Sequence, residues 1–165
     1  MSKDTIVIRE IKPKDNTPLE AVIRACFYEF KIPLKGTAYE DPETKKMFES
    51  YQNDDDIYYV LEKNGEVLGG AGVKPLRNFE GNICELQKMY FSPKVRGEGY
   101  GKQMFETCLN AAEKLGYEKC YIESAPQLKA AIHVYESFGF THLKGPLGNT
   151  GHSSCSVWMI KDLCN

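Results

Sequence analysis

A glycine-rich segment near the middle of the chain constrains the fold more than any other feature. It reads Arg96-Gly97-Glu98-Gly99-Tyr100-Gly101-Lys102, follows an apolar stretch that ends at Phe91, and runs directly into an amphipathic helical pattern. Glycine permits backbone angles that other residues resist and lets a ligand approach the main chain closely. Successive amides at the start of a helix bind anions well, because the positive end of the helix dipole supports them. The segment therefore predicts a phosphate-binding turn between a strand and a helix.

The spacing of this turn does not fit the two common nucleotide motifs. A P-loop requires Ser or Thr after Gly-Lys, but Gln103 follows Gly101-Lys102. The dinucleotide pattern G-x-G-x-x-G would require glycine at position 102, where lysine stands. Lys94, Arg96 and Lys102 nevertheless add local positive charge to a chain whose formal net charge is −2. Both nucleotide interpretations are therefore weakened, while the prediction of a phosphate ligand stands.

The remaining pattern, Arg96-x-x-Gly99-x-Gly101, resembles the Gln/Arg-x-x-Gly-x-Gly/Ala signature of the GNAT superfamily of acetyl-CoA-dependent N-acetyltransferases. A second segment, Tyr135-Glu136-Ser137-Phe138-Gly139-Phe140, resembles the family's Tyr-Glu-x-x-Gly-Phe stretch. The similar order of elements extends from about Thr5 to Lys161. The resemblance implies an α/β (α+β) GNAT fold, in which a mixed, mostly antiparallel sheet has a central β-α-β crossover and helices on both faces. It also implies acetyl-CoA as the co-substrate.

Length and composition favour one globular domain that spans residues 1–165. The 165 residues are 42% hydrophobic and 27% charged, which is ordinary for a soluble protein. The sequence pI of about 6.0 and the scattered lysines argue against a nucleic-acid partner. No apolar run reaches the roughly 18 residues that span a bilayer, and the first residues lack the apolar core of a signal peptide. We therefore expect a cytoplasmic protein with no membrane partner.

The cysteines do not form a pattern typical of a disulfide scaffold or a metal site. The chain is long for a disulfide scaffold and has no C-x-x-C pair. His152-x-x-Cys155 is half of a metal-ligand spacing, and no second half is present. We expect reduced thiols in the core and no metal. The six cysteines are Cys26, Cys84, Cys108, Cys120, Cys155 and Cys164.

Hydrophobic periodicity in the first half predicts a strand, two helices and three antiparallel strands. The strand covers 5–11, a helix capped by Thr17-Pro18 follows, and a shorter helix covers about 43–52. Asn64-Gly65 favours a tight hairpin turn between strands at 57–63 and 66–74. A further strand at about 83–91 leads into the glycine turn.

The second half alternates helices and strands. We expect a helix at about 99–115 that ends before Gly116, and a strand at 118–123. Ser124-x-x-Gln127 is typical of a capping box and predicts that the next helix opens there and stops at Gly139. Strands near 140–143 and 154–160 complete the domain. A right-handed crossover then makes 83–91 and 118–123 parallel neighbours, and the resemblance implies that these two strands splay apart at their C-terminal ends.

The resemblance assigns the cofactor-binding residues. The backbone just before the turn would pair with the pantetheine amides, and the amides of the turn would meet the diphosphate. Carried over to this chain, the first group is Met89, Tyr90 and Phe91, and the second is Arg96, Gly97, Glu98, Gly99, Tyr100, Gly101 and Lys102. Many relatives carry asparagine seven residues before the tyrosine, but Leu128 stands there in this chain. The cofactor contact that the asparagine makes is therefore in doubt.

Tyr135 and Glu85 are the candidate catalytic residues. The resemblance puts the Tyr135 hydroxyl next to the thioester sulfur, where a phenol with a pKa of ~10 could act as the acid. Periodicity alone would favour an ordinary core tyrosine. Glu85 is the leading base, because strand alternation puts 85, 87, 89 and 91 on one face and relatives often place a carboxylate on this strand. An ordinary strand glutamate is an equal alternative.

His152 and a water chain remain open as alternative bases, since the ordinary pKa of histidine, ~6.5, suits proton removal. Cys155 could be a nucleophile, but nothing adjacent lowers its pKa, so we expect direct attack in a ternary complex. The resemblance implies an acceptor pocket formed by the loops at 31–41 and 144–153, including Tyr39 and His152.

The sequence thus predicts an N-acetyltransferase that acts on a primary amine of a small molecule or peptide. The alternative is a non-catalytic acyl-CoA sensor on the same fold. The identity of the amine stays open, because loops of this kind vary freely between functions. Dimerisation through exposed edge strands is compatible with the sequence, which does not decide it.

Overall fold

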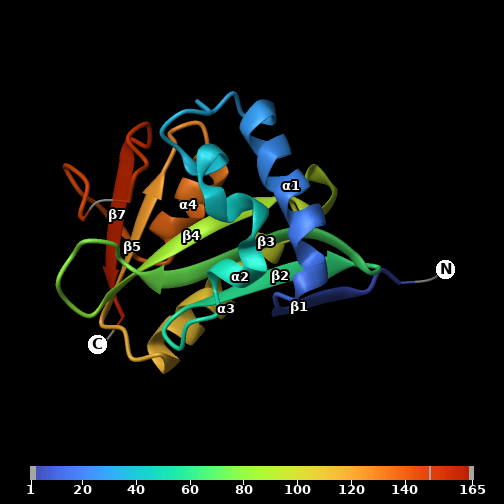
Figure 1. Ribbon diagram of the computed structural model, residues 1–165, viewed down its shortest axis with the longest axis horizontal. Coiled ribbons are helices and arrows are strands. Elements are labelled where there is room, and N and C mark those ends of the chain that lie inside the picture. The colour runs from blue at the N-terminus through green and yellow to red at the C-terminus, as the bar shows by residue number, and fades with distance from the viewer. Residues whose placement is uncertain (1–2, 149, 164–165) are drawn as a thin grey trace.

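A seven-stranded sheet forms the centre of the protein in the computed structural model, which describes residues 3–148 and 150–163 (Figure 1). The strand order is β1-β2-β3-β4-β5-β7-β6, and all neighbours are antiparallel except β4 and β5. The strands are β1 (Ile6–Glu10), β2 (Ile57–Lys63), β3 (Glu66–Pro75), β4 (Ile83–Phe91), β5 (Lys119–Ser124), β6 (Thr141–His142) and β7 (Val157–Asp162).

Helices cover both faces of this sheet (Figure 1). They are α1 (Asn16–Glu29), α2 (Met47–Ser50), α3 (Tyr100–Lys114) and α4 (Lys129–Ser137). The first two pack on one face around Phe27, Tyr58 and Val60, and the other two pack on the opposite face around Leu61, Met104 and Phe105. The predicted fold class and order of elements are therefore confirmed.

The hairpin and the helix endings form as the sequence predicts. Asn64 and Gly65 have φ angles of 52° and 84° and connect β2 to β3. Gly116 and Gly139 both have a φ of 91° and follow the ends of α3 and α4. These are positions where the chain must adopt a left-handed conformation, which glycine does at little cost.

The crossover through α3 makes β4 and β5 parallel neighbours, but only over a short stretch. Their pairing runs from Ile83–Lys119 to Glu85–Tyr121. Beyond this point β4 continues to Phe91 and β5 to Ser124 without pairing to each other. The expected splay is therefore present, and it leaves a wedge in the sheet whose vertex lies at Glu85.

Two predicted helix starts are wrong. A 3₁₀ turn at Pro13–Asp15 precedes α1, which begins at Asn16 instead of being capped by Thr17. The Asp15 carboxylate accepts a hydrogen bond from the Lys12 amide at 2.7 Å and pairs with Arg9 at 2.8 Å. These contacts stabilise the turn and extend the helical path upstream.

The Ser124 capping box also fails. Ser124 is the last residue of β5 and is buried, and α4 begins only at Lys129. The Leu128 amide donates to the Ala125 carbonyl at 3.0 Å, so a separate turn connects the strand to the helix. Pairing with β7, in which Ser124 faces Val157, extends the strand through the serine.

A β-bulge in β4 overturns the predicted alternation of side chains. Lys88 has a φ of 51°, and the register with β3 shifts there, because Gly70 faces Tyr90 while Gly72 faces Gln87. A bulge inserts one extra residue and reverses which face the following side chains use. Met89 and Phe91 accordingly pack on the α3 and α4 face, away from the face that holds Tyr90.

Among the described residues, every helix is too short or too polar to cross a membrane. Cys26, Cys84, Cys108 and Cys120 are unpaired and buried, as predicted, and Cys155 is unpaired and half-buried. Cys164 lies outside the described residues.

Candidate active site

The glycine turn adopts the geometry expected of an anion site. Gly97 and Gly99 have φ angles of 81° and 85°, and a Cβ at either position would meet open space. The Gln103 amide donates to the Gly99 carbonyl at 3.2 Å as α3 begins. The amides of Tyr100, Gly101 and Lys102 precede this bond and have no acceptor within the helix. The turn therefore offers amides to a ligand at the positive end of the helix dipole.

A groove of about 290 Å³ runs from this turn along β4 to α4. The part of the groove along β4 and α4 is apolar and suits a flexible chain, and the end at the glycine turn suits an anion. Residues of β4, the turn and α4 line it, among them Met89, Phe91, Gly99, Gly101, Lys102 and Val134. Gly101 has no positive φ, so the backbone does not require glycine there. The missing side chain instead leaves the groove open.

The Arg96 side chain does not supply free positive charge to the turn. Its Nη2 donates to the Phe91 carbonyl at 2.6 Å and to the Glu29 carboxylate at 2.9 Å. Its guanidinium also lies 4.8 Å from the centre of the Phe30 ring, and the Arg96 amide donates to the Pro93 carbonyl. Arg96 therefore ties α1 to the end of β4, and Glu29 neutralises it. Lys94 likewise pairs with Glu66 at 3.2 Å.

Tyr135 points from α4 toward the end of the wedge. Its ring packs 5.2 Å from that of Phe105, and its hydroxyl lies 3.9 Å from the Met89 sulfur. Burial raises the pKa of Tyr135 above its ordinary 10, so the hydroxyl stays protonated at neutral pH. Tyr135 is thus a core residue whose protonated hydroxyl lies at the wedge.

A second cavity, of about 40 Å³, occupies the wedge between β4 and β5. Met89, Tyr90 and Leu128 line both this cavity and the groove, so the two spaces share a wall. Leu128 contributes an apolar surface at the junction, where an asparagine would offer a hydrogen bond. The arrangement brings an elongated groove and a small polar pocket together near Tyr135.

Glu85 lies at the vertex of this pocket and is only 3% exposed. Burial raises the pKa of Glu85 to about 7, the hydrogen bond from Gln87 opposes this rise, and the Glu123 carboxylate adds to it. A carboxyl group with this pKa changes protonation readily near neutral pH, which suits a general base.

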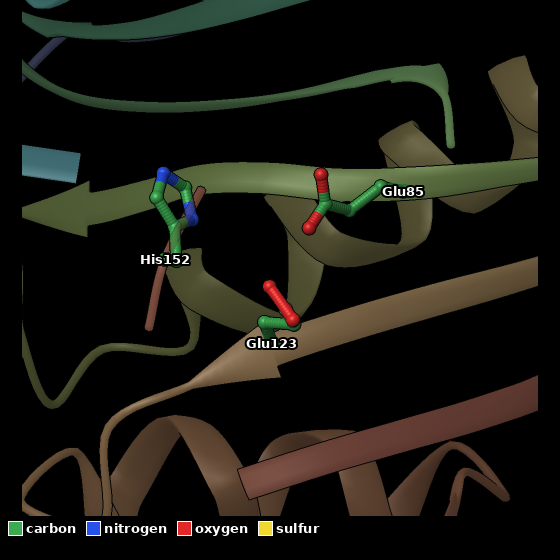
Figure 2. Close-up of side chains that lie close together, drawn as sticks. All are labelled: Glu85, Glu123 and His152. Carbon is green, nitrogen blue, oxygen red and sulfur yellow. The ribbon is translucent and has the colours of Figure 1, made fainter. Parts of the chain in front are cut away.

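His152 and Glu123 converge on Glu85 from the other side of the wedge (Figure 2). One donor atom from each of the three residues lies within 4.8 Å of the others. Tyr121 donates to the Glu123 carboxylate at 3.0 Å, and Thr150 donates to it as well. These three side chains are of the kinds that bind metal ions. First-row metal ions form bonds of about 2.0–2.2 Å to such atoms, so their ligand atoms must lie closer together than the 4.8 Å limit found here. The prediction of no metal stays a prediction.

Asp41 fixes the position of His152. The His152 Nε2 lies 2.7 Å from the Asp41 carboxylate, which also pairs with the buried Lys88 at 3.2 Å. Burial is the largest single effect and disfavours the imidazolium, but the hydrogen bond to Asp41 and the negative charges of Asp41 and Glu85 together outweigh it and raise the pKa of His152 above its ordinary 6.5. Burial alone would raise the pKa of Asp41. The hydrogen bonds and positive charges of His152 and Lys88 outweigh burial and lower this pKa below its usual value.

Sequence reasoning found Glu85, Tyr135 and His152 but missed Asp41 and Glu123. Neither missed residue belongs to a motif, and only the meeting of distant segments gives them a role. The resemblance implies Tyr39 in the acceptor pocket, but Tyr39 does not line the wedge cavity. Its hydroxyl bonds that of Tyr28 at 2.9 Å, and the Arg24 guanidinium lies 4.5 Å from its ring centre, so it packs on α1.

Cys155 lines the wedge but is a poor nucleophile. Burial raises the pKa of its thiol to about 12, and the carboxylates of Glu123 and Glu85 add to this effect. The reactive thiolate is therefore scarce at neutral pH.

Residues 23–140 match the acetyltransferase (GNAT) family. The chain belongs to this family, whose acyl donor is acetyl-CoA, and it is an acyltransferase. The uncharacterized N-acetyltransferase YjgM of Escherichia coli is 39% identical over 158 residues, which cover 95% of each chain. The IAA acetyltransferase of Azospirillum brasilense is 26% identical over 108 residues, and the match covers 66% of this chain and 69% of that protein.

Solved structures share the fold at lower identity. A GNAT acetyltransferase from Staphylococcus aureus superimposes with a TM-score of 0.83 at 18% identity, covering 96% of this chain and 99% of its own. The putative acetyltransferase yncA from Salmonella typhimurium, solved with acetyl-CoA, has a TM-score of 0.77 at 20% identity. The match covers 98% of this chain and 95% of the yncA chain. These likenesses show the fold.

Proposed function

We propose that this enzyme transfers the acetyl group of acetyl-CoA to a primary amine of a small molecule or peptide by direct attack in a ternary complex. The observation that carries the proposal is the shared wall between the groove and the wedge pocket, with Tyr135 and Glu85 both lining the pocket. Two substrates can meet at such a junction without a covalent enzyme intermediate. The raised pKa of Cys155 also argues against a thiol relay.

The groove fits coenzyme A in its chemistry. The amides of Gly97 to Lys102 would hold the diphosphate, and the backbone of Met89, Tyr90 and Phe91 would lie along the pantetheine. The Phe91 carbonyl is already an acceptor for Arg96, so Arg96 has to share it or move. The yncA protein, which shares this fold and was solved with acetyl-CoA, supports acetyl-CoA as the ligand.

Glu85 and Tyr135 divide the proton transfers between them. Glu85 accepts a proton from the ammonium form of the acceptor, directly or through one water, so that the neutral amine can attack the thioester carbon. A C–N bond forms and the C–S bond breaks. Tyr135 donates its proton to the departing sulfur, which avoids releasing a free thiolate, and it is reprotonated by the second proton that the attacking nitrogen loses as it becomes the amide. The buried position of both residues suits this work, since it limits competing reactions with solvent.

An amine screen tests the proposal. The protein would be incubated with acetyl-CoA and a panel of amino acids, polyamines, aminoglycosides and short peptides, and the loss of thioester absorbance would be followed. This readout avoids thiol reagents, which would also react with the protein's own cysteines. Amine-dependent loss of the thioester, with the acetylated amine found by mass spectrometry, supports the proposal. Tight binding of acetyl-CoA without turnover of any amine would instead favour an acyl-CoA sensor.

We also infer a cytoplasmic location. The unpaired thiols of the described cysteines and the use of acetyl-CoA support a reducing compartment. Cell fractionation with an antibody against the protein tests this inference.

A further inference from the structure

The proposed reaction leaves the buried base with a proton that has to leave the pocket. An ammonium acceptor loses two protons when it becomes an amide, and only one of them ends on the sulfur of coenzyme A. The other is released once per turnover. Glu85 is 3% exposed, so it does not pass this proton directly to solvent. A second group must therefore carry the proton from Glu85 outward.

His152 lies close to Glu85, is partly exposed, and has the orientation that such a group needs. Its Nε2 is bonded to Asp41 at 2.7 Å, so the ring nitrogen turned toward Glu85 and Glu123 in Figure 2 is Nδ1. A neutral histidine that donates through Nε2 to a carboxylate keeps a free lone pair on Nδ1. Asp41 therefore selects the tautomer that can accept a proton from the pocket.

The spacing of the cluster fits one bridging water. Donor atoms of Glu85, Glu123 and His152 lie within 4.8 Å of one another. Two hydrogen bonds of about 2.8 Å, at the tetrahedral angle of a water molecule, place their outer atoms about 4.6 Å apart. The pocket volume of about 40 Å³ exceeds what one water requires.

We propose that His152, held by Asp41, is the second proton carrier of this active site, which accepts the proton of Glu85 through a water and releases it to solvent. The inference rests on the proposed function, because it assigns the proton that this reaction releases. In the transfer, the Glu85 O–H bond breaks, the water passes a proton to Nδ1, and Glu85 returns to its carboxylate. The imidazolium then loses its Nε2 proton to solvent beside Asp41, where the side chains of His152 and Asp41 are 12% and 23% exposed, and proton exchange through solvent restores the Nε2-protonated ring for the next turnover.

The charges around His152 support an imidazolium that forms transiently. Asp41 faces it from the loop before α2, Glu85 and Lys88 face it from β4, and Glu123 faces it from β5. Lys88 opposes the cation, while the carboxylates favour it. Asp41 is partly neutralised by Lys88, which limits how strongly it holds the proton on His152.

Docking of two loops places His152 in the pocket. The Ser154 amide donates to the Gly36 carbonyl at 2.9 Å, and the Ser154 hydroxyl donates to the Lys35 carbonyl at 2.7 Å. Together with the bond between Asp41 and His152, these contacts hold the loop around His152 against the segment that precedes α2. Asp41 is therefore a positioning residue in this proposal.

Nuclear magnetic resonance of the histidine rings tests the arrangement without any acceptor. The chain has three histidines, so single substitutions assign every ring signal. We expect neutral His152 to be protonated on Nε2, and we expect Asp41→Asn to move its titration midpoint to lower pH and weaken this tautomer preference. A neutral His152 protonated on Nδ1 would overturn the proposal.

Kinetics then test the proton transfer, using an amine that the wild type acetylates. His152→Ala should lower kcat by about 10- to 100-fold, leave the KM for acetyl-CoA unchanged, and regain activity when imidazole is added. His142→Ala is the matched control, because His142 also pairs with a carboxylate, Glu136 at 3.0 Å, but is 51% exposed and lies outside both cavities. It should keep full activity.

Two results would contradict the inference. Unchanged kcat and pH dependence in His152→Ala would remove His152 from the proton path. Loss of activity that imidazole does not rescue would assign His152 a structural role only, whether or not the circular dichroism spectrum also shows a loss of folded structure. A wild type that acetylates no amine would count against the proposed function instead.

Discussion

Glu85 combines burial with a proposed role, as general base, that requires it to be charged. Its pKa is raised from an ordinary 4.5 to about 7, so the folded protein binds a proton there more tightly than the unfolded chain does. This contribution to stability is fully present below pH 4.5 and is lost as the pH rises through 7. The residue therefore makes the folded state less stable at the pH at which it would act as the proposed base.

Substitution of Glu85 by glutamine separates these two properties. We predict that Glu85→Gln lowers kcat by at least about 100-fold. At pH 8 the variant should be more stable than the wild type by up to about 3 kcal/mol, because it no longer has to ionise a buried group. Urea denaturation at pH 4 and pH 8 measures the difference, which should shrink at the lower pH. A variant that is less stable than the wild type at both pH values would show that Glu85 is mainly a structural partner of Gln87.

Tyr135 has two interpretations that a single substitution distinguishes. Its ring packs in the core, while its hydroxyl is only 3.9 Å from a sulfur, which is a weak contact. We predict that Tyr135→Phe lowers kcat by about 10- to 100-fold and changes the free energy of unfolding by less than about 1 kcal/mol. Steady-state kinetics and urea denaturation provide the two numbers. Full activity would mean that water or another group protonates the sulfur.

At the scale of elements, the turn before α3 could be predicted in detail and the bulge in β4 could not. Three glycines at fixed spacing carry their own backbone preference, so the local sequence is sufficient. The bulge at Lys88 has no such signal, because lysine has no preference for a positive φ. It depends on the neighbouring strand: a Cβ at Gly69 or Gly70 of β3 would collide with Phe91 or Tyr58. The alternation pattern of β4 alone therefore predicts the wrong face for Met89 and Phe91.

Two glycines of the turn have different roles, which substitutions separate. Gly101 has ordinary helical angles, so Gly101→Val should leave the fold intact and raise the KM for acetyl-CoA at least about 10-fold by filling the groove. Gly99→Val should raise it as well, and should also cost about 1–2 kcal/mol of stability because its φ is 85°.

Gly65→Val provides the control for backbone strain. Gly65 has a φ of 84° and open space around it, but lies in the hairpin between β2 and β3, away from the groove. It should lose stability like Gly99→Val with no change in KM. Normal KM values in both turn variants would mean that the groove does not bind acetyl-CoA through this turn.

At the scale of the whole molecule, the splayed strands create the candidate active site. Pairing of β4 with β5 stops at Glu85, so the strand ends separate and expose a buried carboxylate to a pocket. The loops that precede α2 and β7 then enclose this pocket, through Asp41 and His152. The fold class, the crossover and the splay could be predicted from the order of elements and the family resemblance.

The contents of the pocket could be predicted only in part. Tyr135 belongs to a recognisable motif, and Glu85 follows from the carboxylate that relatives often place on this strand. Asp41, Glu123 and the role of Leu128 at the junction depend on contacts between segments far apart in the sequence, and no local pattern encodes such contacts. Helix starts failed for a related reason, since tertiary contacts of Asp15 and Ser124 outweigh local capping preferences.

A crystal structure of the protein with acetyl-CoA tests the central claim most directly. We predict that the diphosphate lies against the amides of residues 97–102 and that the thioester lies between Tyr135 and the pocket of Glu85. A diphosphate bound anywhere else on the protein would contradict the proposed active site.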